Sequence, residues 1–409
     1  MDFELGTCTA DNLREFLETT EATFGHSAPA DLVDRFEHLI PPDRATYVSE
    51  GDVMVGTAGI YPFTLTIPGG EIPAAGVTMV GVLPSHRRKG VLTRMMRRQF
   101  EESRDRGEPV AVLWASEGGI YERFGYGIAA VQHQVGIERQ HAKFRDDPGP
   151  SGRIRLHSLD KAAHAIGPIW DRVRKERPGL FVRTSDWWKH HTLADPEEHR
   201  RGGGPMFCAV WEKDSEDHAY ALYRLHASWD WGSPNGRLNV KEVVADSSEA
   251  TREMWRFLFG VDLAIKVETN IASLAVDDPL PLMIEEMRRV HTIRWDSLWV
   301  RIVDVAPALE ARSYATGGVL VLELDDPHCP WNTGRWRIEA RPDGASVATT
   351  GDEPDVRMTP QDLGQIYLGG FTFSQLHRAG RLEELSTGAI ARADSMFVTD
   401  VAPWCPEIF

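Results

Sequence analysis

The spacing of hydrophobic and polar positions changes near Pro84, and this change predicts a strand followed by a helix. Residues 72–83 form a β-rich run that stops at the proline. From about Gly90 to Phe100 the apolar residues recur at helical spacing and share one face. Residues 109–116 then form a short apolar run typical of a buried strand. The order strand, loop, helix, strand predicts a parallel strand pair joined by a crossover helix.

The same order of elements occurs twice along the chain, which predicts two related α/β (α+β) domains. The first copy has predicted helices at 10–24 and 30–39 and strands at 45–50, 53–66 and 72–83. Polar residues 144–153 resemble a linker. The second copy has predicted helices at 159–175 and 185–194, strands at 206–213, 218–227 and 236–245, and a helix at 247–262. We therefore predict domains at 1–143 and 154–290.

A third predicted domain covers residues 298–409. Strand-like runs alternate with turn signals in its first half, including the segments WVRIVDV, GGVLVLELDD, WRIEARPDG and ASVATT. The segments TPQDLGQIYLGG and TFSQLHRAGRL follow with helical spacing. Three domains also suit a chain of 409 residues, because one hydrophobic core seldom supports that length.

The loop between the first strand and its helix carries the clearest chemistry. Backbone N–H groups at a helix start form an anion site, and a glycine allows close approach of a pyrophosphate. The neighbouring cations Arg87, Arg88 and Lys89 add charge beside Gly90. The chain lacks the G-x-x-x-x-G-K-S/T loop of nucleotide triphosphatases, and this loop lacks G-x-G-x-x-G. The remaining R-x-x-G-x-L pattern predicts a phosphate loop, and a solvated basic helix start is the alternative.

Tyr121 follows the second strand of this unit, within SEGGIYERFGYG. A phenol stays protonated at neutral pH, so it can donate a proton to a developing anion. The alternative is a half-buried tyrosine that caps a turn. Ser116, at the end of the strand, is a candidate donor to a bound ligand or an orienter of Tyr121, and alternatively a helix cap.

Charge and composition narrow the possible partners. The chain has 45 basic and 61 acidic residues, a formal charge of −16, which disfavours nucleic-acid binding. The acidic balance favours cationic substrates, although taken by itself the charge is better explained by solubility. We see no secretory signal and no apolar run of the ~20 residues that span a bilayer, so we expect a cytoplasmic protein. The four cysteines lie far apart and fit reduced thiols.

Metal binding is not expected. His190, His191 and His199 lie close together in sequence, but no H-E-x-x-H or spaced Cys/His set accompanies them. We interpret these histidines as a solvated helix face.

Three segments resemble one family across the whole chain: VLPSHRRKGVL, ASEGGIYERFGYG and the C-terminal FVTDVAPWCPEIF. They are similar to the Eis (enhanced intracellular survival) family of GNAT acetyltransferases. The resemblance implies tandem GNAT-like domains followed by a sterol-carrier-protein-like domain. In the second GNAT-like copy, Asp246, Ser247, Ser248 and Glu249 replace the basic loop, and an acidic loop would repel a pyrophosphate. We therefore expect that copy to lack the CoA loop.

The resemblance also implies acetyl-CoA as cosubstrate, no metal, and a set of site residues. Tyr121 would protonate the departing CoA thiolate, and the carboxylate of the terminal Phe409 would act as general base. A frayed terminus is the alternative for Phe409. The predicted cofactor-binding residues are Val80, Val82, Arg87, Arg88, Gly90, Val91, Leu92 and Ser116.

Eis enzymes acetylate amines of bulky polycations, notably aminoglycosides, so the resemblance implies a small-molecule amine as acceptor and a role in antibiotic resistance. Candidates for the acceptor pocket are Phe24, His26, Phe36, Asp296 and Glu407. His26 stands where an acidic residue is expected. The alternatives are acetylation of protein or peptide lysines or of polyamines, a non-catalytic acyl-CoA sensor, and lipid carriage by the last domain. By resemblance we expect a homo-hexamer, with no nucleic-acid or membrane partner.

Overall fold

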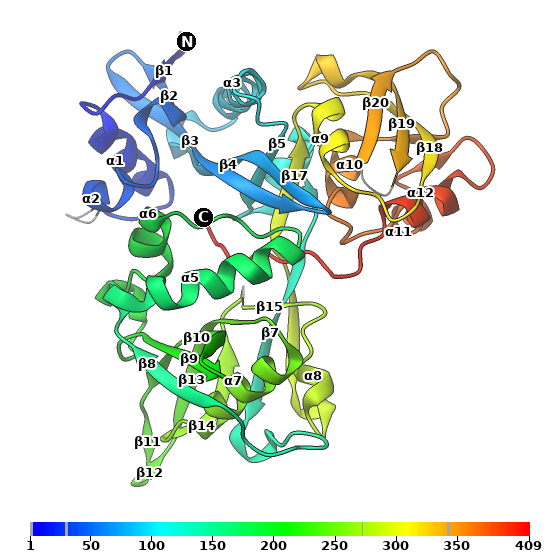
Figure 1. The fold of residues 1–409 in the computed structure, drawn as a ribbon. Coiled ribbons are helices and arrows are strands. Elements are labelled where there is room, and N and C mark those ends of the chain that lie inside the picture. The colour runs from blue at the N-terminus through cyan, green and yellow to red at the C-terminus, as the bar shows by residue number, and fades with distance from the viewer. Residues whose placement is uncertain (1–2, 29–31, 272, 342–343) are drawn as a thin grey trace. The chain divides into compact units, whose positions relative to one another are not determined.

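The computed structural model describes residues 3–28, 32–271, 273–341 and 344–409, and the chain divides into two compact units (Figure 1). Unit 1 comprises residues 1–129, 298–400 and Phe409, and unit 2 comprises residues 130–297 and 401–408. Within the described ranges, none of the helices combines the length and apolar character needed to traverse a bilayer.

The first sheet of unit 1 is mostly antiparallel, with one parallel pair between β4 and β5. In spatial order its strands are β1 (Phe3–Thr7), β2 (Ala45–Glu50), β3 (Val53–Ile67), β4 (Gly70–Val82), β5 (Val110–Trp114), β17 (Leu298–Ile302) and β6 (Gly127–Ile128). The associated helices are α1 (Leu13–Thr23), α2 (Leu32–Phe36), α3 (Val91–Asp105) and α4 (Gly118–Tyr121), with 3₁₀ turns at Pro42–Arg44, Pro84–His86 and Glu122–Phe124. The predicted strand, loop, helix, strand unit is confirmed. Residues 30–31 of the predicted helix 30–39 lie outside the described residues.

Helices α1 and α3 cover opposite faces of this sheet. A Cβ on Gly56 would meet Val91 of α3 at 2.7 Å, so glycine permits this close approach. The next residue, Thr57, lies 3.0 Å from the hydroxyl of Thr20 on α1. Since successive strand residues point to opposite faces, the two helices sandwich β3. Burial of Met95 and other apolar residues on one side of α3 explains why its sequence is amphipathic.

The third domain also belongs to unit 1 and has its own sheet. In spatial order the strands are β20 (Gly344–Thr349), β19 (Gly334–Arg341), β18 (Gly318–Leu324), β21 (Val356–Met358) and β22 (Glu383–Glu384). Its helices are α9 (Val305–Ala311), α10 (Pro360–Ile366), α11 (Phe373–Arg378) and α12 (Ala389–Phe397), with a 3₁₀ turn at Pro330–Asn332. Residues 342–343, within the predicted strand run WRIEARPDG, lie outside the described residues. Strands followed by helices agree with the prediction for this domain.

Unit 2 repeats the topology of the first sheet. In spatial order its strands are β15 (Leu274–Ala275), β7 (Val131–Glu138), β14 (Ala264–Thr269), β13 (Gly236–Ala245), β10 (Glu216–His226), β9 (Phe207–Lys213) and β8 (Arg153–His157), while β16 (His291–Asp296) also pairs with β7. A small ribbon joins β11 (Trp229–Asp230) to β12 (Ser233–Pro234). The helices are α5 (Leu159–Glu176), α6 (Ser185–Trp187), α7 (Ser248–Gly260) and α8 (Leu280–Met283), with a π-helical turn at Trp188–Thr192 and 3₁₀ turns at Arg139–His141, Glu197–Arg200 and Met287–Arg289. Strands β13 and β14 are parallel and flank α7, as β4 and β5 flank α3.

Two strands pair in a different unit from the domain to which the sequence assigned them. The strand β7 lies in the predicted first domain but pairs with β14 in unit 2. The strand β17 lies in the predicted third domain but pairs with β5 in unit 1. Each repeat thus includes a strand that sequence order assigned to a different domain. A strand can pair with any sheet edge of suitable pattern, so sequence order alone does not choose the partner.

In the second copy, the N-terminus of the helix is capped by a serine side chain. Ser247 caps α7, accepting a hydrogen bond from the backbone N–H of Ala250 at 3.2 Å. Glu249 forms an ion pair with Lys213 at 2.7 Å. A capped start with an acidic residue offers no anion site, so the expected loss of the CoA loop agrees with this geometry.

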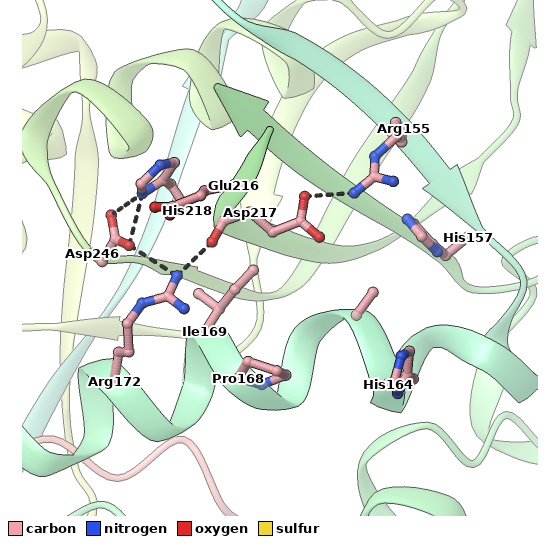
Figure 2. A pocket seen from close by; sticks show the side chains of 11 residues that line it. Arg155, His157, His164, Pro168, Ile169, Arg172, Glu216, Asp217, His218 and Asp246 are labelled. Carbon is pink, nitrogen blue, oxygen red and sulfur yellow. Dashed lines mark hydrogen bonds and ion pairs between the residues drawn. The ribbon is translucent and has the colours of Figure 1, made fainter. Parts of the chain in front are cut away.

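A cavity of about 770 Å³ lies near the same end of β13 in unit 2 (Figure 2). Its Asp217 is paired with Arg155 at 2.5 Å. Its Asp246 is paired with Arg172 at 3.0 Å and lies equally close to His218. These acids are therefore engaged by basic side chains of the same domain.

Candidate functional site

The loop before α3 presents unused backbone donors. Gly90 is the N-cap of α3 with φ +84°, and it provides no side-chain cap. Arg88 is also in the left-handed region, with φ +63°. In the described part of the chain, the first backbone hydrogen bond into this helix is from Arg94 N–H to the Gly90 carbonyl. The N–H groups before it remain available at the positive end of the helix dipole.

The residues of this loop fit the pyrophosphate of acetyl-CoA. A Cβ on Gly90 would meet nothing within 4 Å, so glycine serves the backbone conformation and leaves open space beside the amides. Arg87, Arg88 and Lys89 are all exposed beside it. Free N–H groups with adjacent cations form the type of concave anion site that binds phosphates.

Strand β4 separates from β5 before the chain reaches this loop. The parallel pair runs from Ala74 opposite Val110 to Gly76 opposite Val112, and no further pairing between these strands occurs in the described residues. We call the point after Gly76 and Val112 the fork. Beyond the fork, β4 also contains a bulge against β3, where Met79 adopts φ +52°. A bulge turns backbone groups out of the ladder, so β4 can offer them to a ligand there.

A hydroxyl group holds the bulge in place. Thr57 of β3 donates a hydrogen bond to the Met79 carbonyl at 3.0 Å. Thr20 of α1 lies 3.0 Å from the same hydroxyl, which links the helix to the bulge. Gly81 is required next to it, because a Cβ there would overlap the side chain of Thr23 at 2.0 Å.

Tyr121 ends α4 and is buried, with 7% of its surface exposed. It shares a core cluster with Val77 and Leu113, the first residues of β4 and β5 beyond the fork. Its ring packs edge-on against Tyr126 with centroids 5.9 Å apart. Burial, together with the nearby Glu117 carboxylate, raises the pKa of Tyr121 to about 12. The hydroxyl is therefore a neutral proton donor at physiological pH.

The terminal Phe409 lies on the other face of β4. Its ring packs edge-on against Phe63 at 5.0 Å and Tyr61 at 6.3 Å, both on β3. The Phe63 ring occupies the space over Gly76, where a Cβ would approach to 2.3 Å. Because neighbouring strand residues alternate in direction, the side of Gly76 is opposite to that of Val77. Phe409 and Tyr121 therefore flank the fork from opposite faces of β4.

Most of the remaining predicted cofactor residues have side chains that pack into the core, which leaves their backbone groups as the candidate ligand contacts. Val91 is fully buried, and Val80, Val82 and Leu92 pack partly buried against the same core cluster. Ser116 is exposed after β5, and the N-cap of α4 is Glu117, so Ser116 does not cap that helix. Its hydroxyl stays a predicted donor to a ligand.

The predicted acceptor residues fall into both units. In unit 1, Phe24 is 49% exposed at the end of α1, and exposed His26 lies 3.5 Å from Glu21. Phe36 is half-buried and packs in the cluster that also contacts Met79 of the bulge. In unit 2, half-buried Asp296 ends β16.

Contrary to the prediction from the sequence, the structure does not place Glu407 where it could bind the acceptor. Its side chain is 3% exposed, and its carboxylate binds the guanidinium of Arg183 at 2.5 Å. A buried carboxylate that is already paired with a cation is not available to an acceptor amine.

Sequence reasoning missed the aromatic pair Tyr61 and Phe63 and the bulge support from Thr57. The alternation of strand 53–66 places Tyr61 and Phe63 on one face, which is the signal that could have found them. No group of three or more His, Cys, Asp or Glu side chains suited to a metal ion occurs among the residues that the structure describes.

Comparisons with known proteins cover the whole chain. Acetyltransferase (GNAT) domain families match residues 4–129 and 179–302, and a sterol carrier protein domain family matches residues 305–406. An uncharacterized N-acetyltransferase of Streptomyces avermitilis is 38% identical over 402 residues, which is 98% of each chain. The N-acetyltransferase Eis of Mycobacterium tuberculosis is 33% identical over 414 residues, again 98% of each chain.

Structural similarity extends equally far. The crystal structure of Eis1 from Mycobacterium abscessus matches with a TM-score of 0.85 and 32% identity, covering 100% of both chains. Tandem GNAT domains with a sterol-carrier-like domain are confirmed as the fold, and the GNAT fold implies use of acetyl-CoA. The chain is a GNAT N-acetyltransferase and belongs to the Eis family.

Proposed function

We propose that this enzyme transfers the acetyl group of acetyl-CoA directly to amines of aminoglycosides or similar polycations, without an acyl-enzyme. The observation that carries the proposal is the fork of β4 and β5, flanked by Tyr121 and Phe409 within unit 1. A buried phenol on one face and a terminal carboxylate beside the other suit an acid and a base that act on different atoms.

Acetyl-CoA supplies an activated acetyl group as a thioester. In the proposed reaction the Phe409 carboxylate accepts a proton from the acceptor amine, directly or through water, and the amine nitrogen bonds to the acetyl carbon. The carbon–sulfur bond then breaks, and the Tyr121 hydroxyl donates its proton to the sulfur. Backbone N–H groups near Val80 in the bulge would polarise the acetyl carbonyl. After product release, bulk solvent reprotonates Tyr121 and takes up the proton from the Phe409 carboxyl group.

A polycationic acceptor is supported by the charge of the chain and of α1. The formal charge is −16, and α1 carries Glu15, Glu18 and Glu21 against the single cation Arg14. The exposed ring of Phe24 directly follows these acids. An aromatic surface beside carboxylates suits a bulky amine, because ammonium groups interact with both.

We expect kcat to show no alkaline decline below about pH 10. Burial raises the pKa of Tyr121 to about 12 and so favours its neutral form, which means the acid remains protonated as the pH rises. Deprotonation of the acceptor amine should instead increase the rate. Initial rates at saturating substrates across this range test the expectation, with rates without enzyme subtracted. A descending limb with an apparent pKa below about 9 would contradict the assignment of Tyr121 as the acid.

The acceptor class is tested by CoA release with aminoglycosides, polyamines and lysine peptides, followed by mass spectrometry of the products. Acetylation of several aminoglycosides, at more than one amine, is the expected result. Turnover confined to peptides or polyamines would support the proposed transfer mechanism but contradict the proposed acceptor class. Binding of acetyl-CoA without turnover on any amine would favour a sensor, and lipid bound to the purified protein would favour carriage by the third domain.

A further inference from the structure

The C-terminal segment 402–408 is fastened to unit 2 by hydrogen bonds along its length. The backbone contacts are Asp277 Oδ2 with Ala402 N–H at 2.8 Å, Arg177 Nη1 with the Ala402 carbonyl at 2.7 Å, the Pro178 carbonyl with Trp404 N–H at 2.9 Å, and Ser297 Oγ with the Cys405 carbonyl at 3.0 Å. Last residues of a chain ordinarily fray, so this density of contacts requires a reason.

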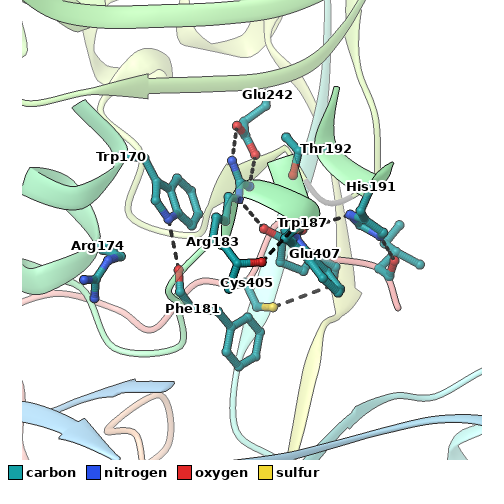
Figure 3. Close-up of polar contacts among 12 residues, drawn as sticks. Trp170, Arg174, Phe181, Arg183, Trp187, His191, Thr192, Glu242, Cys405 and Glu407 are labelled. Carbon is teal, nitrogen blue, oxygen red and sulfur yellow. Dashed lines mark hydrogen bonds and ion pairs between the residues drawn. The ribbon is translucent and has the colours of Figure 1, made fainter. Parts of the chain in front are cut away.

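Glu407 adds a buried ion pair to these contacts. One carboxylate oxygen accepts from Arg183 Nε at 2.5 Å, and the other accepts from Trp187 Nε1 at 3.2 Å (Figure 3). Burial acts to raise the pKa of Glu407, but the attraction of Arg183 outweighs it and holds that pKa below its usual range. The ion pair is therefore present at neutral pH.

Other residues of unit 2 fix the orientation of the Arg183 guanidinium that binds this carboxylate. Its guanidinium lies 3.5 Å from the ring centroid of Trp170 and 4.6 Å from that of Trp188. Its two terminal nitrogens bind Glu242 at 3.0 and 2.6 Å, which leaves Nε for Glu407. A planar guanidinium fixed on its faces and one edge can bind a second carboxylate in only one place.

The anchor continues to the residue before the terminus. His191 Nε2 donates to the Ile408 carbonyl at 3.1 Å. Phe409 follows one residue later, so its Cα lies within about 7 Å of the Glu407 Cα by chain length alone. Fixing Glu407 and Ile408 therefore restricts the positions that the Phe409 carboxylate can reach.

We propose that Glu407 is a positioning residue whose ion pair with Arg183 holds the C-terminal tail so that the Phe409 carboxylate stays in place for catalysis. This inference rests on the proposed role of that carboxylate. The first test is release of Phe409 by a carboxypeptidase, measured by mass spectrometry on the intact folded protein. For Glu407→Ala we expect release at least about ten times faster than in the wild type, because the ion pair with Arg183 and the hydrogen bond from Trp187 are lost.

Two further variants make the test specific. Glu407→Gln keeps acceptors for Arg183 and Trp187, so its release rate should lie between those of the wild type and Glu407→Ala. Asp400→Ala removes an exposed acid just before this segment, and should match the wild type. Arg183 retains Glu242 in Glu407→Ala, so the variant is expected to stay folded, which circular dichroism checks.

Kinetics separate this inference from the proposed function. Glu407→Ala should lower kcat about tenfold or more with the KM for acetyl-CoA unchanged, and should have no effect on kcat once Phe409 is deleted. Equal release rates in the wild type and Glu407→Ala, or an equal loss of kcat with and without Phe409, would overturn the positioning role. Full turnover by wild-type enzyme from which Phe409 has been removed would instead overturn the proposed base, and the positioning role with it.

Discussion

Replacing Tyr121 with phenylalanine is expected to lower kcat by a factor of about 10²–10⁴, with little change in the affinity for acetyl-CoA. The substitution removes only the hydroxyl. The ring keeps its edge-on contact with Tyr126 at 5.9 Å and its place in the core cluster beside Val77. The lost rate therefore reports the missing proton donor, because the fork and the phosphate loop remain intact.

Tyr126→Phe is the matched control for this prediction. The Tyr126 hydroxyl is buried and has no hydrogen-bond partner among the described residues, so its removal leaves no acceptor unsatisfied. We expect kcat within about threefold of the wild type. Single-turnover rates and acetyl-CoA binding by calorimetry should be measured for both variants. A Tyr121→Phe enzyme that is as active as Tyr126→Phe would exclude the acid role.

The loop and helix at Gly90 were predictable from sequence because their signals are local. A strand run, a proline, a basic loop and an amphipathic helix lie within about one supersecondary unit. The positive φ of Gly90 also follows from the residue type. Met79 also has a positive φ although it is not a glycine, so no signal in the sequence indicated the bulge. Its conformation depends on Thr57, which lies on the neighbouring strand.

Long-range pairing explains the rest of the differences. The family resemblance predicted Glu407 as an acceptor ligand because it is an acidic residue of the C-terminal domain, but its partner Arg183 is 224 residues away in sequence. The strands β7 and β17 likewise pair across distances that no local pattern encodes. Burial and partner identity are properties of the folded chain, so they were the least predictable parts of the site.

Deletion of Phe409 is expected to lower kcat by about 10²–10⁴, comparable to the Tyr121 variant. The deletion removes the ring that packs on Phe63 and Tyr61, and it moves the terminal carboxylate back by one residue, about 3.5 Å of chain. A base displaced by that distance no longer reaches the acceptor nitrogen. Initial rates across acceptor concentrations should show the loss in kcat, with acetyl-CoA binding unchanged.

Two variants separate the ring from the carboxylate. Adding one glycine after Phe409 keeps the ring but moves the carboxylate outward, so it should be nearly as harmful as the deletion. Phe409→Leu keeps the carboxylate in place and an apolar side chain against Phe63, so it should lose less than about tenfold. If the glycine extension instead retained full activity while Phe409→Leu did not, the tail would act through packing of the ring, and water or another group would have to deprotonate the amine.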